Sequence, residues 1–271
     1  MSLFGDLLAP RYLLWLLQGF EFTLALSAAV SGAGTVLGLA ACCLREVGGP
    51  APRRAVAVFV GLVRNTPLLV QLFVWYFAVA ALLPSGMTAW LNAPHILDLG
   101  PATLSWPAYE TLAGFVGLTV YAGAYIAEEG RAGINGVRST QREAALALGL
   151  TPVQAFRHIV LPQALRIAWL PIVGQYLNTI KNTALTMTIG LAELSYASRQ
   201  AETETFKTFQ AFGIATLLYI GAVALVEAAG QALVRRAAAQ ASRARTSRSS
   251  PTISATCWSG PGPTGRSAAL R

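Results

Sequence analysis

Polar side chains that could contact a solute interrupt two strongly apolar stretches of the chain. The two sets are Arg64, Asn65, Thr66, Pro67 and Gln71, and Asn178, Lys181, Asn182 and Thr183. An Arg or Lys at the centre of a membrane helix costs about 2.5–3.5 kcal/mol on insertion scales, so both sets are candidates for a translocation path or gate. Two alternatives remain open. Pro67 is also expected to kink a helix while Arg64 reaches the membrane interface. Asn178, Lys181 and Asn182 share one helix face and could instead join neighbouring helices by hydrogen bonds.

A long polar segment, residues 128–166, separates two apolar stretches and carries two short helix signals. The first helix is predicted from Gln141 to Leu148, with Gly149 ending it. The second begins with Thr151 at the N-cap, Pro152 at N1 and Gln154 at N3, which is the pattern of a capping box. Pro162 is expected to interrupt this helix. This pattern predicts a helix, a sharp turn and a second helix between two membrane spans.

Glu128 and Arg131, at the start of the same polar segment, are three residues apart. On a helix this spacing places them on one face, which predicts a structural ion pair.

Enzyme chemistry is not indicated. Both lysines, Lys181 and Lys207, lack the preceding glycine that a standard nucleotide-binding P-loop needs. The three cysteines and the two histidines, His95 and His158, have no spacing typical of a metal site or a disulfide framework. We therefore predict no catalytic residues, no metal and no cofactor on this chain.

Composition indicates an all-α membrane protein. The 271 residues are 54% hydrophobic and only 12% charged, with a mean hydropathy of +0.52. Soluble domains carry about 25% charged residues. Apolar stretches of suitable length predict five spans, at residues 20–44, 55–83, 111–127, 167–191 and 209–234. Residues 84–110 and 192–208 are predicted to be loops.

The distribution of basic residues predicts the orientation. Fifteen of the 20 Lys and Arg residues fall in residues 45–54, in the polar segment 128–166 and after residue 234. The positive-inside rule then places the N-terminus outside and the C-terminus in the cytoplasm, and it explains the net charge of +8 without nucleic acid. The predicted parts are an interfacial segment (1–19), a transmembrane domain (20–236) and a disordered cytoplasmic tail (237–271).

The polar segment resembles a known signature. Glu143, Ala144, Ala145, Gly149 and the pair Leu161-Pro162 resemble the EAA loop by which permeases of ABC importers dock their ATPase. The run from Arg64 to Gln71 resembles the R-x-T-P-L-L-V-Q signature of polar amino-acid importers, and the stretch from Arg64 to Pro84 is most similar to the glutamate/aspartate branch. The resemblance covers about residues 19–236. Departures include Ala132 and Ala184, where the family usually has Gly and often Ser.

The resemblance implies the fold and partners of a type I ABC importer permease in the bacterial inner membrane. Two ATPase subunits carrying ATP and Mg²⁺, a substrate-binding protein and a second permease, identical or homologous, are the expected partners, in a lipid bilayer. The expected substrate is a polar amino acid of the glutamate, aspartate or glutamine type. The alternatives are another small solute, such as an opine or a sulfur compound, and an autonomous secondary carrier or channel.

Overall fold

Helices make up nearly all of the computed structural model, which describes residues 8–93, 96–98, 103–105 and 108–248. The first half of the chain contains α1 (Pro10–Val47), α2 (Pro50–Arg64), α3 (Leu68–Phe73), a π-helical turn η1 (Val74–Ala78), α4 (Val79–Leu82), α5 (Ser85–Asn92), β1 (Ile96–Asp98) and β2 (Thr103–Ser105). The second half contains α6 (Tyr109–Asn135), α7 (Ser139–Ala147), α8 (Pro152–Ala155), a π-helical turn η2 (Phe156–Val160), α9 (Leu161–Asn182), a 3₁₀ turn η3 (Thr183–Ile189), α10 (Leu194–Thr205) and α11 (Thr208–Arg248).

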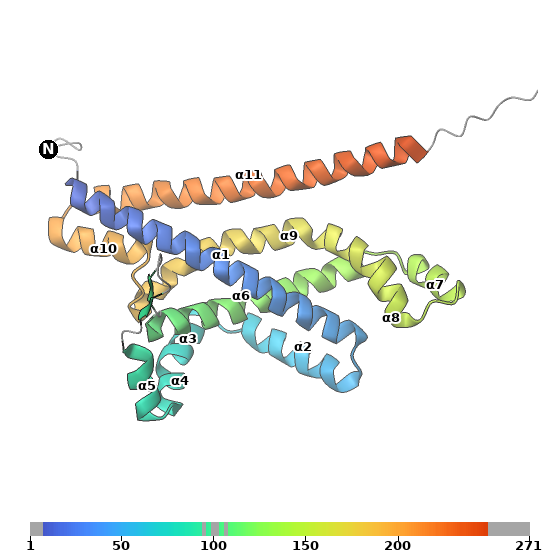
Figure 1. Ribbon diagram of the computed structural model, residues 1–271, viewed down its shortest axis with the longest axis horizontal. Helices are drawn as coiled ribbons and strands as arrows, with labels where there is room; N and C mark the ends of the chain where they lie inside the picture. The colour runs from blue at the N-terminus through green and yellow to red at the C-terminus, as the bar shows by residue number, and fades with distance from the viewer. Residues whose placement is uncertain (1–7, 94–95, 99–102, 106–107, 249–271) are drawn as a thin grey trace, which may run out of the picture. The chain divides into compact units, whose positions relative to one another are not determined.

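α1, α6 and α9 pack together and form the centre of the bundle (Figure 1). The contact between α1 and α6 is close because glycines lie in it. A Cβ on Gly38 would come within 2.7 Å of the Gly123 carbonyl oxygen and 2.8 Å of Ile126. Membrane helices pack closely through such small residues, since burial of apolar surface drives little association in lipid. α2 packs on the same pair, through a cluster of Val56, Val60 and Ala127.

The second predicted span, residues 55–83, is not a continuous helix. α2 and the helical stretch from α3 to α4 meet at an angle of 104°. Pro67 is the N-cap of α3 and has an extended backbone, which is the conformation that separates the two helices. The kink expected at Pro67 is therefore confirmed, and it is sharp enough to break the span.

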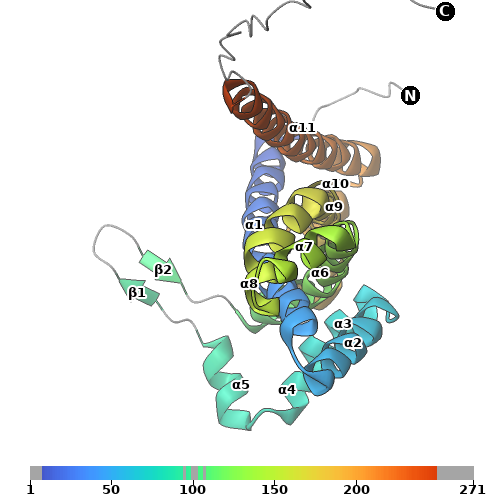
Figure 2. The ribbon, with the colours of Figure 1, turned by 90° about the vertical axis from the view of Figure 1, so that its right-hand side faces the viewer.

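Two predicted loops contain regular structure. Residues 84–110 hold α5 and the short antiparallel ribbon of β1 and β2, which Figure 2 shows beside α5. Residues 192–208 hold α10, whose Leu194, Ala197 and Ala201 are buried, while most of its exposed residues are polar. Its average polarity conceals a narrow apolar stripe at helical spacing, which is why the sequence interpretation as a loop is wrong.

Among the described residues, fewer helices than the five predicted spans are long and apolar enough to cross a membrane. α1, α6 and Thr208–Val234 of α11 are each long and apolar enough to cross a membrane, and the bent pair of α2 and α3–α4 would make a fourth. α9 is not among them, because its polar residues lower its mean hydropathy. Five spans with the N-terminus outside therefore remain a prediction.

The helices at the two ends of the chain extend beyond the predicted spans. α1 begins at Pro10, not near residue 20, because Tyr12 and Leu16 are buried against the second half of the chain. α11 runs to Arg248, past the predicted domain end at 236. Contacts divide the chain into Met1–Gln231 and Ala232–Arg271, and the described part of the latter is the end of α11. The disorder predicted for the tail concerns mostly residues 249–271, which lie outside the described residues.

Candidate functional site

The turn between α7 and α8 has the predicted sharp geometry. Gly149 follows the end of α7 with a φ of +85°. Its N–H donates to Leu146 O (2.9 Å), and the Leu150 N–H donates to Ala145 O (3.2 Å). These two bonds form a Schellman motif, which needs a residue in the left-handed region. A Cβ on Gly149 would meet nothing within 4 Å, so the backbone conformation alone favours glycine here.

The second helix opens with the predicted capping box. The Gln154 N–H donates to Thr151 Oγ1 (3.3 Å), and the Thr151 N–H donates to Gln154 Oε1 (2.9 Å). The expected interruption at Pro162 is wrong. α8 continues through η2 into α9, so Pro162 lies inside a continuous helix. It follows directly after the π-helical turn η2, where the regular i→i−4 hydrogen bonds are already interrupted.

The tip of this loop exposes apolar side chains. Leu148, beside Gly149, is 82% exposed, and Leu146 and Val153 are exposed as well. Glu143 and Ala144 lie on the same exposed helix, whereas Ala145 is buried. Isolated apolar residues are common on protein surfaces, but three on one short loop form a candidate docking surface. Leu148 was not among the predicted residues, although an apolar residue in a tight turn is a signal.

Leu161 and Pro162 do not lie at this tip. Both belong to the first turn of α9, and Leu161 lines the same small cavity as Cys42 and Gly130. Figure 2 views the end of the bundle where α7 and α8 lie in front of α9. The predicted coupling residues thus divide into a tip, from Glu143 to Gly149, and a base at the start of α9.

An ion pair joins the tip to the first helix. Arg142 Nη1 of α7 lies 3.3 Å from Glu46 Oε1, near the end of α1. The Arg142 side chain is 52% exposed and that of Glu46 is 23% exposed. The pair therefore links α7 to the bundle by a contact that water reaches.

The side chains around Pro67 are used mainly to hold the bend. Gln71 Nε2 donates to Val63 O (2.7 Å) and to Thr66 Oγ1 (2.8 Å), and Thr66 Oγ1 donates to Leu62 O (2.9 Å). These bonds satisfy carbonyls that the broken helix releases. Thr66 and Gln71 thus stabilise the kink that was expected as the alternative role of Pro67.

Arg64 turns away from the bend toward α6. Its Nη1 lies 3.9 Å from Glu128 Oε1, and its guanidinium lies 5.1 Å from the centre of the Tyr125 ring. Arg131 Nε donates to the same carboxylate oxygen (2.8 Å), so the predicted pair of Glu128 and Arg131 is present. Arg45, at the end of α1, lies 3.6 Å from Glu128 Oε2 and was not predicted. Its only sequence signal is its position at the end of an apolar stretch.

The four polar residues predicted near the end of α9 lie at different depths in the structure. Asn178 and Lys181 are exposed and Asn182 is half-buried, so these three lie along the surface of the chain. Thr183 differs: it is completely buried, and its hydroxyl donates to Ile180 O (2.7 Å). Three of the four residues can therefore face a path or a partner, and Thr183 has a structural role.

A completely buried carboxyl group, Glu193, joins three segments and was not predicted as a site. Its Oε1 accepts from the Tyr196 N–H (2.9 Å) and its Oε2 from the Tyr219 hydroxyl (2.8 Å) and the Thr23 hydroxyl (3.5 Å). Burial raises the pKa of Glu193 above the usual carboxyl range. A lone acid between apolar residues was the only signal for it.

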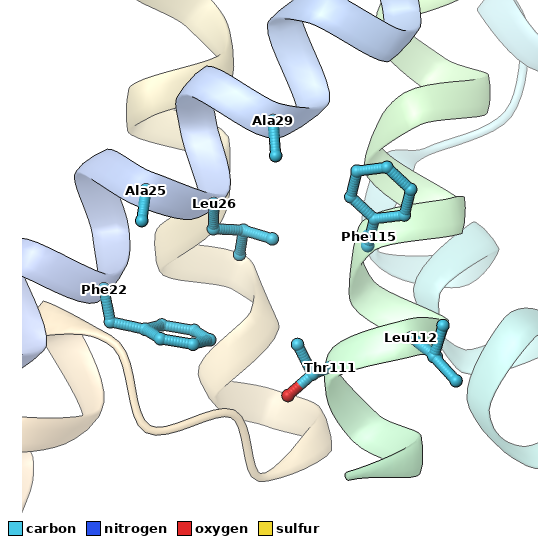
Figure 3. Close-up of a pocket in the computed structure, with 7 residues that line it drawn as sticks. All are labelled: Phe22, Ala25, Leu26, Ala29, Thr111, Leu112 and Phe115. Atoms are coloured by element: carbon cyan, nitrogen blue, oxygen red, sulfur yellow. The ribbon is translucent and has the colours of Figure 1, made fainter. Parts of the chain in front are cut away.

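Figure 3 shows a cavity of about 270 Å³ between α1 and α6. Six of its seven lining residues are apolar, and Thr111 provides its single hydroxyl: Phe22, Ala25, Leu26, Ala29, Thr111, Leu112 and Phe115. Such a lining does not suit a charged amino acid. The described residues also contain no cluster of three or more His, Cys, Asp or Glu side chains that could hold a metal ion.

Comparison with known proteins identifies the family. A family model described as "Binding-protein-dependent transport system inner membrane component" matches residues 34–239. The chain belongs to this family. It is a transport permease subunit, and the polar loop with α7 and α8 lies within the matched region.

Two relatives from Escherichia coli K12 have specific names. The chain is 32% identical to the "Glutamate/aspartate import permease protein GltJ", over 77% of this chain and 81% of the relative. It is 31% identical to the "Glutamine transport system permease protein GlnP", over 76% and 84%. The resemblance to permeases of polar amino-acid ABC importers is therefore confirmed.

Solved structures confirm the fold. One, titled "Crystal structure of an amino acid ABC transporter with histidines", matches with a TM-score of 0.70 and 24% identity, over 83% of this chain and 95% of the other. An inward-facing MetNI methionine transporter matches with a TM-score of 0.68 and 22% identity, over 84% and 98%. The permease has the all-α fold of ABC importer permeases.

Proposed function

We propose that this chain is the permease subunit of an ATP-driven importer that carries a polar amino acid across the bacterial inner membrane. The observation that carries this proposal is the exposed tip from Glu143 to Gly149, with the exposed Val153 beyond the turn, within a chain of the binding-protein-dependent family. Leu148 and Val153 there offer apolar surface to a groove of an ATPase subunit, and the exposed Glu143 adds a charge that would fix its orientation.

The proposed partners are inferred from the missing P-loop and from the exposed polar residues of α9. Its sequence holds no P-loop, so ATP and Mg²⁺ would bind to two separate ATPase subunits. Asn178 and Lys181 lie exposed on α9, where lipid would be a poor environment for them. A second permease, identical or homologous, would cover this face and complete a polar path. A substrate-binding protein would deliver the amino acid at the outer side.

Transport would follow from a shift between two conformations. Closure of the ATPases on ATP would move the two loop tips, and α7 and α8 would pass this movement to α9, with which α8 is continuous through η2. A ligand shifts such an equilibrium only by its differential affinity for the two states. Glutamate, aspartate and glutamine are the proposed substrates because relatives are named for them.

The test compares reconstituted vesicles with and without the candidate ATPase and binding protein. We expect ATP-dependent uptake of labelled glutamate or glutamine only with all components. Leu148→Asp should abolish both uptake and co-purification of the ATPase, because it places a charge in the docking surface. Phe206→Asp is the matched control, since Phe206 is an equally exposed apolar residue (86%) in a turn outside the loop, and it should retain the ATPase.

Two results would overturn the proposal. Uptake by the permease alone, indifferent to ATP and to Leu148→Asp, would identify a secondary carrier or channel. ATP-dependent uptake of an opine or a sulfur compound, with none of any amino acid, would keep the importer and replace its substrate.

A further inference from the structure

Two cavities lie end to end along one face of α1. The first is the apolar cavity of Figure 3, with a volume of about 270 Å³, between α1 and α6. The second, of about 500 Å³, lies between α1 and α10. The α1 residues that line them recur at helical spacing and share Phe22: Trp15, Gln18, Gly19, Phe22, Ala25, Leu26 and Ala29. We call the two cavities together the Phe22 groove.

The Phe22 groove changes from polar to apolar along its length. At α10, the amides of Gln18 and Gln200 and the hydroxyl of Tyr196 belong to residues that line it, and Trp15 lies at the same end. Between α1 and α6 the lining is apolar except for Thr111. No charged residue is among the described residues that line either cavity. The groove therefore suits a ligand with a polar end and a long apolar part.

The apolar part of the groove opens toward the surroundings of the helices. α1 and α6, which flank it, are both long and apolar enough to cross a membrane. Ala25 and Ala29 line this part and are exposed on the surface of the chain. In Figure 3 the larger side chains of Phe22 and Leu26 extend from α1 toward α6, while each alanine contributes only a methyl group. Hydrocarbon is the surrounding that a membrane-crossing helix pair provides here.

The polar part of the groove fits the membrane interface. The exposed residues of α10 are mostly polar, which suits water or lipid headgroups better than hydrocarbon. Trp15 and Tyr196 have the amphipathic rings that are enriched at this level of a membrane. The groove thus passes from the interface into the hydrocarbon core.

The length of the groove fits one leaflet of a bilayer. From Trp15 to Ala29, α1 rises about 21 Å at 1.5 Å per residue. A bilayer with its headgroups is about 40–45 Å thick, so one leaflet occupies about half of that distance. An apolar membrane helix from another protein would match only the inner part of the groove, whereas a phospholipid matches both ends.

From this arrangement we infer that the Phe22 groove binds one phospholipid, with an acyl chain between α1 and α6 and the phosphate and glycerol esters beside Gln18, Tyr196 and Gln200. These three side chains form no hydrogen bond with any residue that the structure describes, so their donors are available to phosphate and ester oxygens. Because the lining carries no charge, phosphatidylethanolamine should bind as well as phosphatidylglycerol. The inference does not depend on which solute the permease carries.

The test uses a phosphatidylethanolamine with a photoreactive diazirine in its acyl chain. The purified full-length permease is placed in nanodiscs of phosphatidylcholine that contain a small, increasing fraction of this probe, and the labelled residues are located by mass spectrometry. We expect label on residues 22–29 of α1 and near Phe115 of α6. This labelling should saturate at a low fraction of probe, because a specific site fills before the remaining lipid-facing surface does.

Ala29→Phe should lower the labelling about fivefold or more, because the added ring fills the apolar part of the groove. Ala28→Phe is the matched control, since Ala28 is also an exposed alanine of α1 and lines neither cavity. Gln200→Leu should weaken binding of the probe about twofold or more, since it removes a hydrogen-bonding group. Gln200 is exposed on α10, so this variant tests the site even where Ala29→Phe fails to fold.

The inference fails on any of three results. Labelling that rises in proportion to the probe, and that neither Ala29→Phe nor Gln200→Leu changes, would mean ordinary contact with the surrounding lipid. A disulfide between two copies of Ala25→Cys would identify the groove as an interface between permeases. A tenfold preference for phosphatidylglycerol that added salt abolishes would place the bound lipid at a charged site elsewhere on the chain.

Discussion

Glu193 shows how one carboxyl group can hold several segments together. It caps α10 through the Tyr196 N–H and receives hydroxyl groups from Thr23 of α1 and Tyr219 of α11. Thr23 in turn accepts from the Leu194 N–H (3.1 Å). A buried polar group of this kind is stabilising only while its partners remain in place.

We predict that Glu193→Ala lowers the apparent melting temperature of the purified protein by several degrees. The change leaves buried donors without an acceptor, and each costs about 1–3 kcal/mol. Glu193→Gln should have a smaller effect because it keeps one carbonyl acceptor. Glu227→Ala, which removes an exposed carboxylate that accepts a bond from Gln231 (3.3 Å), is the control and should cost less than either change.

The same residue predicts a dependence of stability on pH. Because burial raises the pKa of Glu193 in the folded protein, the folded state binds its proton more tightly than the unfolded chain does. Stability from this group is therefore complete at low pH and is lost as the pH rises through the folded-state pKa. Melting curves across that range should show the fall in the unaltered protein and a weaker one in Glu193→Gln. An identical pH profile for both would contradict the assignment.

At the scale of elements, close approach of α1 and α6 depends on Gly38. We expect Gly38→Leu to separate the two helices, since the added side chain would overlap Gly123 and Ile126, and overpacking typically costs about 1–3 kcal/mol. Gly32→Leu is the matched control on the same helix, because a Cβ there meets nothing within 4 Å. Equal melting temperatures for the two variants would show that the contact is not needed.

Local signals in the sequence predicted local structure well. The capping box at Thr151, the turn at Gly149 and the pair of Glu128 and Arg131 all depend on residues within a few positions of one another, and the structure contains all three. Arg45 and Glu193 could not be found in this way. Their partners, Glu128 and Thr23, lie far away in the chain, and only packing brings them together.

Average hydropathy predicted amphipathic helices poorly. α9 contains Asn178 and Lys181 on one face and buried Ala168 and Ile172 on another, so its mean value describes neither. α10 has the same property on a smaller scale. The number of membrane spans therefore depends on whether an amphipathic helix such as α9 is counted, and average composition is no measure of that.

At the scale of the whole molecule, the pair of Arg142 and Glu46 joins α7 to the end of α1. We predict that movement of the loop, if an ATPase drives it as proposed, reaches α1 through this pair. Its partial exposure limits its contribution to stability to about 0.2–1 kcal/mol. Arg142→Glu should therefore leave the melting temperature nearly unchanged and lower ATP-driven uptake by about 1.4- to 5-fold, which is that energy expressed as a rate.

The exchanged pair Arg142→Glu with Glu46→Arg should restore uptake, because the attraction is re-formed with reversed charges. Arg138→Glu alters the same exposed loop beyond this pair and serves as the control. Failure of the exchange to rescue uptake, with the ATPase still bound, would mean that α7 transmits its movement by another contact.

The exposed Lys181 has a consequence for how the protein is made in the cell. A newly inserted copy presents this ammonium group and Asn178 beside it to its surroundings until something polar covers them. If a second permease covers this face, as proposed, a copy without that partner would keep the charge of Lys181 uncovered. We would then expect such a copy to be degraded sooner than an assembled one. The residues proposed to guide a solute would thereby also limit the lifetime of orphan subunits, so that abundance of the transporter follows the scarcer of its two halves.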